Sequence, residues 1–283
     1  MQNVVRTLLF DEQVSLTVAD TTEMIKEGAR RHGLSETSTI VFGRALSVAT
    51  YMSACLKENT GEISLSVKSD GCGEIVVSGN RALHLRGYIA LTNAEGKGEA
   101  AVNACFGTDG SLTVIRDDGY NRPFVGARAF PKNGGIDETF EEYYRISEQL
   151  PTRIKTIALT NEHGECVFGG VAVLQPLPFA DEETLEKVKT IDLSTLLLSA
   201  REQGVEKAVK DRFDVSSEVW ETREANYQCN CSREYLEQVL TSVGEEQMRT
   251  IIREDGALKV HCHYCNTDYE FTDEDADKIF KKA

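Results

Sequence analysis

The sequence lacks long hydrophobic runs, since nowhere do the roughly 18 consecutive apolar residues occur that a membrane-spanning helix needs. Its first 13 residues reach Asp11 and Glu12 after only a short apolar stretch, unlike a secretory signal peptide. We therefore expect neither membrane insertion nor secretion, and we predict a cytoplasmic location.

Positive charge is also scarce. Against 46 Asp and Glu residues stand 31 Lys and Arg residues, which gives a formal net charge of −15. Such a charge repels phosphate backbones and anionic lipids, so we expect neither nucleic acid nor a membrane as a partner. Hydrophobic residues make up 41% of the chain and charged residues 27%, as is usual for a folded globular protein.

Residues 1–178 predict an α+β domain in which a large sheet is packed with helices. Helical spacing predicts helices over 20–32, with Asp20 as the N-cap, and over 37–57. Alternating apolar residues predict strands across 62–175, with one helix near 137–149. Turns are expected at Asp70-Gly71 and His163-Gly164, and the domain should close at Gln175-Pro176-Leu177-Pro178.

Residues 179–225 form a segment of different character, which is dense in charged residues and contains no proline. This composition predicts helices that are only marginally packed. Val205, Val209 and Phe213 recur at a spacing of four and give a thin apolar stripe on a charged helix. Such a linker can dock or detach, although an ordinary solvated helical hairpin would have the same pattern.

Residues 226–283 carry two close cysteine pairs, Cys229 with Cys231 and Cys262 with Cys265. Four thiolates from two such pairs complete the tetrahedral shell that zinc prefers, so we predict one zinc ion per chain. The second pair lies between expected strands at 258–262 and 267–271, which places it at a hairpin turn. Ser232 should cap a helix between the two pairs. Because this module has few apolar residues, metal should supply much of its stability.

Two interpretations of this site stay open at the level of residues. The zinc could be permanent and hold a small domain together. Alternatively, the single residue between Cys229 and Cys231 places two sulfurs side by side for oxidation, and oxidised thiols bind zinc poorly, so the site could be a redox switch. His261 and His263 flank Cys262 and should point to the opposite strand face, as exposed non-ligands.

The other four cysteines are scattered singly. Cys55 lies on a helical apolar stripe, and Cys105 and Cys166 have apolar neighbours, so we predict all three as small core residues. Cys72 lies between Gly71 and Gly73, which suggests an exposed turn. No function is assigned to these thiols.

With these residues in view, the chain resembles the redox-regulated heat-shock holdase family of about thirty-three kilodaltons, along nearly its whole length. The most specific similarity is in the segments Cys229-Asn230-Cys231-Ser232-Arg233-Glu234, Glu254-Asp255-Gly256 and Cys262-His263-Tyr264-Cys265-Asn266. Weaker similarity lies in Gly43-Arg44-Ala45-Leu46, Leu85-Arg86-Gly87-Tyr88 and Gln175-Pro176-Leu177-Pro178.

The resemblance implies an ATP-independent chaperone that is inactive while reduced and zinc-bound. It implies disulfides between Cys229 and Cys231 and between Cys262 and Cys265 after oxidation, with zinc release. The segment 179–225 would then unfold and expose surface for unfolding client proteins. A homodimer is implied for the active form.

Two other functions would also use a cysteine-rich module of this kind. A dithiol-disulfide oxidoreductase would carry its Cys-x-x-Cys after a strand and at the start of a helix, whereas Cys262 to Cys265 joins two predicted strands. A zinc-ribbon nucleic-acid binder should be basic, whereas 226–283 is acidic. The sequence also has no Gly-rich phosphate loop, Gly-x-Ser-x-Gly elbow or His-Glu-x-x-His, so we expect no enzyme.

Overall fold

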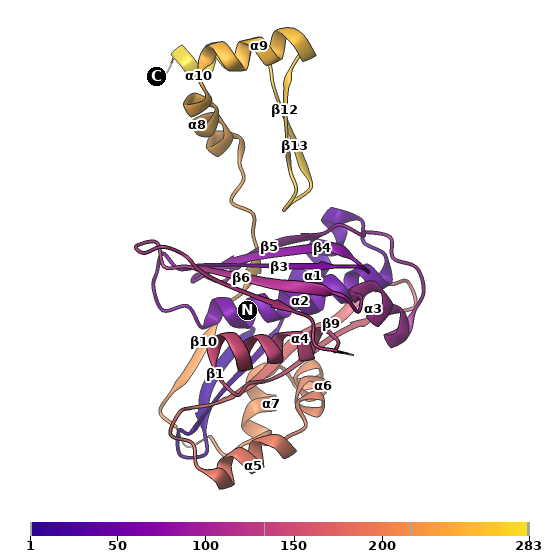
Figure 1. Ribbon diagram of the computed structural model, residues 1–283, viewed down its shortest axis with the longest axis vertical. Helices are drawn as coiled ribbons and strands as arrows, with labels where there is room; N and C mark the ends of the chain where they lie inside the picture. The colour runs from indigo at the N-terminus through magenta and orange to yellow at the C-terminus, as the bar shows by residue number, and fades with distance from the viewer. Residues whose placement is uncertain (1, 133, 216, 282–283) are drawn as a thin grey trace. The chain divides into compact units, whose positions relative to one another are not determined.

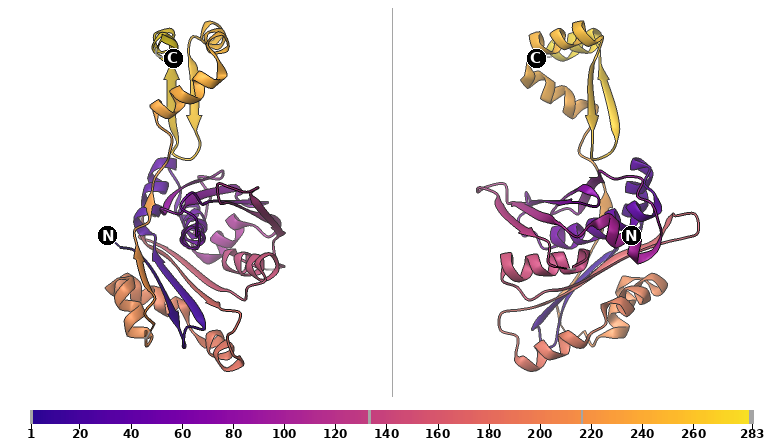
Figure 2. Two further views of the ribbon diagram at one scale, coloured as in Figure 1. Left: turned by 90° about the vertical axis from the view of Figure 1, so that its left-hand side faces the viewer. Right: turned by 45° about the vertical axis from the view of Figure 1, so that its right-hand side comes forward.

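The chain divides into two compact units, Met1–Gln228 and Cys229–Ala283. The computed structural model describes residues 2–132, 134–215 and 217–281 (Figures 1 and 2). The division falls after Gln228, so the segments 179–225 and 226–228 both belong to the first unit. Residues 226–228 belong to the first unit because β11 (Asn226–Tyr227) pairs in parallel with β5 (His84–Ile89).

A five-stranded antiparallel sheet forms one layer of the first unit, with strand order β10-β1-β2-β9-β8. The strands are β1 (Val4–Leu9), β2 (Val14–Asp20), β8 (Arg153–Thr160), β9 (Cys166–Pro176) and β10 (Trp220–Arg223). The predicted turn at His163-Gly164 is confirmed between β8 and β9, where Gly164 has a φ of 79° and its amide donates to Asn161. Strands from both ends of the unit thus lie side by side.

A six-stranded sheet forms the second layer, with order β11-β5-β4-β3-β6-β7. Besides β11 and β5, the strands are β3 (Glu62–Ser69), β4 (Gly73–Asn80), β6 (Gly110–Asp117) and β7 (Phe124–Ala129). The Asp70-Gly71 turn is confirmed, since Ser69 pairs with Gly73 across it. Among the described residues, β7 pairs only with β6 and forms an edge of the sheet.

Helix α2 (Glu36–Ala54) lies between the two sheets and contacts strands of both (Figure 1). It is buried along nearly its whole length. Helix α1 (Thr22–His32) packs so close to it that a Cβ added to Gly43 would lie 2.8 Å from Ile25 Cδ1. Both predicted helices are confirmed, but Asp20 is not the N-cap. Thr21 takes that position, and Asp20 Oδ1 accepts from the Thr22 amide.

Two further helices complete the core of the first unit. They are α3 (Gly98–Phe106), which the sequence reading did not predict, and α4 (Ile136–Tyr143), which continues as a π-helix over Tyr144–Glu148. The prediction of a helix near 137–149 is confirmed. At its start, Asp137 Oδ2 lies 3.1 Å from Arg44 Nη2 and 3.0 Å from Lys155 Nζ, so a charge network joins α2, α4 and β8.

The segment after β9 forms α5 (Glu182–Thr190), α6 (Leu193–Gln203) and α7 (Val205–Arg212). These helices cover the face of the five-stranded sheet opposite α2, where their apolar residues join Leu16, Val18 and Leu174 of the sheet in one cluster. Val205 and Val209 are buried in that cluster, and Phe213 packs against it partly buried. The apolar stripe is therefore docked in this structure.

The second unit is an α/β module around one hairpin. It contains α8 (Arg233–Val243), α9 (Glu245–Asp255), β12 (Leu258–Cys262), β13 (Thr267–Phe271) and α10 (Asp273–Lys281). The two predicted strands and the helix after Ser232 are confirmed, whereas α10 was not predicted. The buried core of the second unit is small and consists of Leu240, Met248, Ile252, Leu258, Phe271, Ala276 and Ile279. Throughout the described residues of both units, no helix is long and apolar enough to cross a membrane.

Candidate metal centre

Local structure brings each cysteine pair into place. After Cys231, the Ser232 hydroxyl accepts a hydrogen bond from the Tyr235 amide at 3.1 Å and starts α8, so the first pair ends at a fixed helix N-terminus. Cys262 is the last residue of β12, and Cys265 lies in the hairpin turn that follows. Asn266 closes this turn with a φ of 52°, a left-handed conformation that Asn tolerates well.

The structure gathers all four predicted ligands in one cluster. The Sγ atoms of Cys229, Cys231, Cys262 and Cys265 lie within 4.8 Å of one another. Cys229 Sγ is 3.7 Å from Cys262 Sγ, and Cys231 Sγ is 3.0 Å from Cys265 Sγ. Four sulfurs at about 2.3 Å from a zinc ion form a tetrahedron with edges of about 3.8 Å. The donor set and its spacing therefore fit a metal ion held by four thiolates.

Two hydroxyl groups support the sulfurs. The Tyr269 hydroxyl donates to Cys231 Sγ at 3.4 Å, and this bond raises the pKa of Tyr269. Thr267 Oγ1 lies 3.3 Å from Cys265 Sγ. Such neighbours orient ligands and tune their charge. Sequence analysis missed both, although Cys262 pairs with Thr267 in the hairpin and period-two alternation places Tyr269 on the same face.

The cluster perturbs the acidity of its own thiols. Burial acts to raise the pKa of Cys229, but hydrogen bonds from the Cys231 amide and the neighbouring thiols lower it below its ordinary value. Burial raises the pKa of Cys231 and of Cys262. The pKa of Cys229 thus shifts in the opposite direction from those of Cys231 and Cys262.

The two histidines beside Cys262 are not part of the cluster. His261 and His263 are both exposed, and their rings meet edge to face with centroids 4.8 Å apart. His261 Nδ1 lies 2.7 Å from Asp268 Oδ1 across the hairpin. The structure therefore places them as exposed residues outside the ligand set.

Three of the other cysteines lie as predicted, and one does not. Cys105 and Cys166 are buried, and burial raises the pKa of each to about 11, while Cys55 is partly buried against the core. Cys72, which the sequence suggested to be in an exposed turn, is fully buried. The turn packs against the end of α3, where a Cβ added to Gly71 would meet Cys105 O at 2.4 Å, and this contact covers Cys72.

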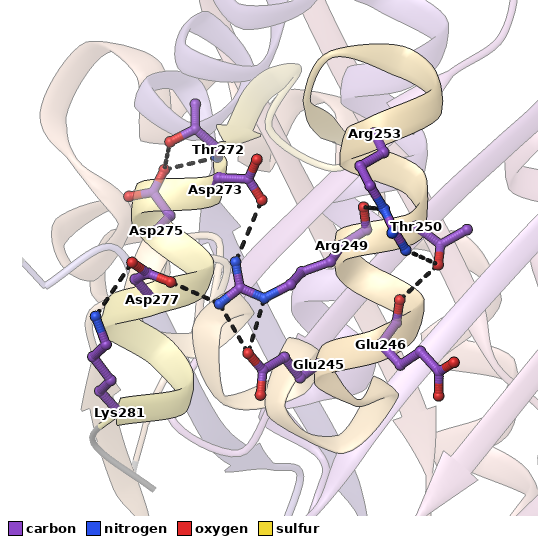
Figure 3. Close-up of polar contacts among 10 residues, drawn as sticks. All are labelled: Glu245, Glu246, Arg249, Thr250, Arg253, Thr272, Asp273, Asp275, Asp277 and Lys281. Atoms are coloured by element: carbon purple, nitrogen blue, oxygen red, sulfur yellow. Dashed lines mark hydrogen bonds and ion pairs between the residues drawn. The ribbon is translucent and has the colours of Figure 1, made fainter.

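Ionic contacts join the helices of the second unit (Figure 3). Arg249 of α9 lies 2.7 Å from Asp277 and 3.4 Å from Asp273 of α10, and 2.8 Å from Glu245 of its own helix. Arg233 of α8 lies 2.9 Å from Asp275. The scaffold around the cysteine cluster thus combines surface ion pairs with a small apolar core.

Known proteins similar to this chain agree on one family. The model of the Hsp33 protein family matches residues 2–272. Proteins named 33 kDa chaperonin from Bacillus cytotoxicus and Bacillus cereus are 32% and 33% identical to this chain, each over 98% of both chains. The crystal structure of the 33 kDa chaperonin (heat shock protein 33 homolog) from Thermotoga maritima superposes with a TM-score of 0.82 at 26% identity, covering 99% of this chain and 98% of that one. The resemblance inferred from the sequence is confirmed, and the chain belongs to the Hsp33 family of chaperones.

Proposed function

We propose that this protein is a redox-regulated, ATP-independent holdase of the cytoplasm. It is inactive while reduced and zinc-bound, and after oxidation it binds unfolding proteins and prevents their aggregation. The observation that carries this proposal is the cluster of four cysteine sulfurs within 4.8 Å of one another, in a unit whose apolar core is small. A reversible change at the sulfurs can therefore decide whether that unit stays folded.

Cys229, Cys231, Cys262 and Cys265 would hold the ion. Bound zinc would keep the four sulfurs as thiolates and add its binding free energy to the folding of the unit. Tyr269 and Thr267 hold the orientation of Cys231 and Cys265 through the contacts described above. In the reduced, zinc-bound state the second unit would then be stably folded.

Oxidation changes the chemistry of the same sulfurs. Each disulfide forms when two thiolates lose two electrons to an oxidant such as a peroxide, and the proposed pairs are Cys229 with Cys231 and Cys262 with Cys265. A disulfide sulfur is a poor zinc ligand, so both the ion and its contribution to stability are lost together.

The linker 179–225 transmits this change. Its last strand, β10, pairs with β1. The next strand, β11, pairs with β5 and ends two residues before Cys229. Unfolding of the second unit therefore removes the folded structure that directly follows these two strands. Once α5, α6 and α7 leave the sheet, Leu16, Val18 and Leu174 lose their cover. This apolar face, together with the helices that leave it, would bind unfolding clients, and the active form would be a homodimer.

The direct test is light scattering from a client that aggregates on heating. The reduced, zinc-loaded protein should leave scattering unchanged, whereas the oxidised, metal-free protein should suppress it without ATP. The client heated with the same oxidant in the absence of this protein is the control for direct effects of the oxidant on the client. Equal suppression by the reduced and the oxidised protein would contradict redox control.

A dithiol oxidoreductase remains the alternative to test in parallel. The Cys262 to Cys265 segment lies in the turn between β12 and β13 rather than at a helix N-terminus, where a low-pKa attacking thiol is usually placed. In an insulin-reduction assay with a recycling dithiol, we expect no turnover above that of the dithiol alone.

A further inference from the structure

Three arginine side chains surround one carboxylate where a turn of the six-stranded sheet meets β10 of the five-stranded sheet. They come from β1, from the turn between β4 and β5, and from β10, and they are Arg6, Arg81 and Arg223. The carboxylate belongs to Glu221, which lies opposite Arg6 in the β1–β10 pair. Its oxygens are 3.8 Å from Arg6 Nη1, 3.9 Å from Arg81 Nη2 and 3.6 Å from Arg223 Nε. Three positive groups and one negative group give this arginine cluster a net charge of +2.

Each guanidinium of the arginine cluster keeps one buried N–H group without an acceptor. Arg6 donates to Ala54 O at 2.9 Å, and Arg223 donates to Arg81 O through Nη2. Among the described residues, no hydrogen-bond partner is found for three other buried atoms, which are Arg6 Nε, Arg81 Nε and Arg223 Nη1. The contacts with Glu221 are all longer than a hydrogen bond. Because a buried donor without an acceptor is costly, the cluster favours a ligand with several anionic oxygens.

Neighbouring charges leave the cluster positive. Burial lowers the pKa of Arg223 most, and the other two arginines lower it further. On the adjoining end of α2, burial raises the pKa of Cys55, whereas the positive charges of Arg6 and Arg116 oppose this rise. Of these two arginines, Arg116 has a close partner of its own, because Glu148 lies 2.8 Å from it. The positive charge that remains uncompensated is therefore that of the arginine cluster.

The cluster can be reached from solvent, and its charge selects a small anion. The side chains of Arg6 and Arg81 are each 29% exposed, and that of Arg223 is 16% exposed. Guanidinium groups match phosphate oxygens with paired N–H donors, and a phosphate dianion has the charge that cancels +2. A nucleic acid or an anionic membrane would also meet the field of the whole chain, whose charge is −15. A small phosphate-bearing anion avoids most of that repulsion.

We propose that Arg6, Arg81 and Arg223 form a binding site for a small phosphate-bearing anion, either inorganic phosphate or a phosphomonoester. Its oxygens accept from the three unpartnered N–H groups, and its two negative charges balance the cluster. Since Arg223 lies on β10, Arg6 on β1 and Arg81 in the other sheet, the anion joins the last strand of the segment 179–225 to the rest of the unit. It binds the arrangement in which β10 is paired, and it stabilises that arrangement.

Isothermal titration calorimetry of the full-length reduced, zinc-loaded protein tests the site. Sodium phosphate and phenyl phosphate are titrated separately at about pH 8 and constant ionic strength, where both carry close to two negative charges. We expect one anion to bind per chain, and the tighter of the two probes identifies the source of the phosphate group. Arg81→Gln removes a charge at a turn and should raise the Kd by about tenfold or more. Lys132→Gln, at an exposed position beyond β7, makes the same change in net charge and is the control, with a change of less than about twofold expected.

A second variant predicts a change of the opposite sign. Glu221→Gln removes the negative charge that competes with the anion, so the Kd should fall by about threefold or more. A variant that has lost its fold cannot bind more tightly, and circular dichroism checks the folding of Arg81→Gln. An absence of saturable binding by both probes, an unchanged Kd in Arg81→Gln, or a raised Kd in Glu221→Gln would each overturn the proposal.

Hydrogen exchange tests whether the bound anion holds β10. At ten times the Kd, opening of β10 should become about tenfold rarer, so its protected amides should exchange about tenfold more slowly, while those of α9 stay unchanged. Unchanged exchange in β10 despite binding would overturn this role of the anion.

The consequence for regulation rests on the proposed holdase function. Phosphate should delay the onset of aggregation suppression after oxidation, compared with sodium chloride of equal ionic strength, and Arg81→Gln should abolish the delay. An equal delay in Arg81→Gln would show that the site does not regulate activation. Binding is measured on reduced protein without a client, so its failure leaves the oxidation-dependent suppression of light scattering untouched, and the reverse is also true.

Discussion

Among the four clustered cysteines, Cys262 links the metal site most directly to the hairpin, because it ends β12 and pairs with Thr267 of β13. Replacing Cys262 with Ser removes one of four thiolates, and we expect most of the zinc affinity to be lost. Zinc content of the reduced protein, measured with a chromogenic chelator, should fall from one ion per chain towards none at limiting metal. His261→Ala is the matched control, since His261 lies outside the cluster and should leave zinc content at one. If Cys262→Ser kept one zinc ion per chain and His261→Ala lost it, the proposed ligand set would be wrong.

Asp118 organises the turn between β6 and β7. Its carboxylate accepts from the Asn121 side chain at 2.7 Å and from the Asn121 and Tyr120 amides at 2.8 Å each. These bonds, the Asn121 side chain first, lower the pKa of Asp118 to about 2. A carboxyl with a lowered folded pKa stabilises the fold above its unfolded value of about 3.9, and this contribution is lost as pH falls towards the folded pKa.

Carboxyl NMR titration tests this prediction. The Asp118 resonance should titrate near pH 2, and Asn121→Ala should move its pKa up towards the ordinary value, since the largest cause is then removed. An Asp118 that titrates at its ordinary value in the parent protein would contradict the turn geometry.

The four clustered cysteines could be singled out from the sequence because metal binding depends on residue type and spacing, which a sequence displays directly. Their neighbours could not be predicted as easily. Tyr269 contributes through a hydrogen bond that exists only once β12 and β13 are paired in one register. Cys72 was misplaced because two flanking glycines suggest exposure, whereas the contact between its turn and α3 is made by residues more than thirty positions further along the chain.

Between elements, the Arg44–Asp137 pair is a largely buried polar connection of the first unit, with side chains that are 8% and 6% exposed. Asp137 also accepts from the Thr156 amide at 3.1 Å and pairs with Lys155. Asp137→Ala would leave Arg44 buried without its main partner, so we expect a loss of about 3–5 kcal/mol in the free energy of unfolding. Urea unfolding followed by circular dichroism measures this change.

Glu99→Ala is the control for the same network. Glu99 lies 3.2 Å from Arg44 Nη1, but its side chain is 70% exposed. Solvent screens such a contact, and its removal should cost at most about 1 kcal/mol. Equal losses for both variants would show that burial does not decide the strength of these pairs.

Helix α7 should control activation through its docked face. Val209 is fully buried against the five-stranded sheet, and burial of a valine contributes about 1.5–3 kcal/mol. Val209→Asp replaces this contribution with an unpaired buried charge, so the linker should detach in reduced protein. Limited proteolysis should then cut within 179–225, and the reduced variant should suppress client aggregation. Leu198→Asp on α6 is the matched control, since Leu198 is 43% exposed and its change should have little effect.

A reduced Val209→Asp variant that is readily cut in the linker yet gives no more suppression than the reduced parent would separate linker unfolding from activation. Phe213 is only partly buried, so Phe213→Asp should give a weaker version of the same effect.

The helices α1 and α2 and the β3–β4 hairpin were predictable because their signals are local, whereas the β1–β2 hairpin was not predicted. Two of the strands that were missed, β10 and β11, have four and two residues and depend on partners far away in the sequence. A strand this short has too few positions to show alternation. The linker helices were predicted from composition, but composition cannot show which surface they cover, and the structure shows that they lie on the sheet opposite α2.

At the scale of the whole molecule, the two units differ in how they are stabilised. The first has a large core that includes α2 and both sheets, whereas the second has seven buried apolar side chains in its core. Removing metal from reduced protein with a chelator should therefore raise hydrogen exchange throughout 229–281, while the amides of α2 stay protected. Retention of full protection in 229–281 without metal would show that its apolar core and ion pairs suffice.

The paired strands β1 and β10 are synthesised at widely separated times. Thr7 pairs with Trp220, so β1 receives this neighbour only after more than two hundred further residues have been added to the chain. At about 5–20 residues per second this takes on the order of 10–40 s, whereas chain collapse takes no more than about 100 μs. During that interval one side of β1 has no strand beside it, and the sheet surface that α5 to α7 will cover is still bare. While it is being synthesised, the growing chain itself exposes the kind of surface that a chaperone binds.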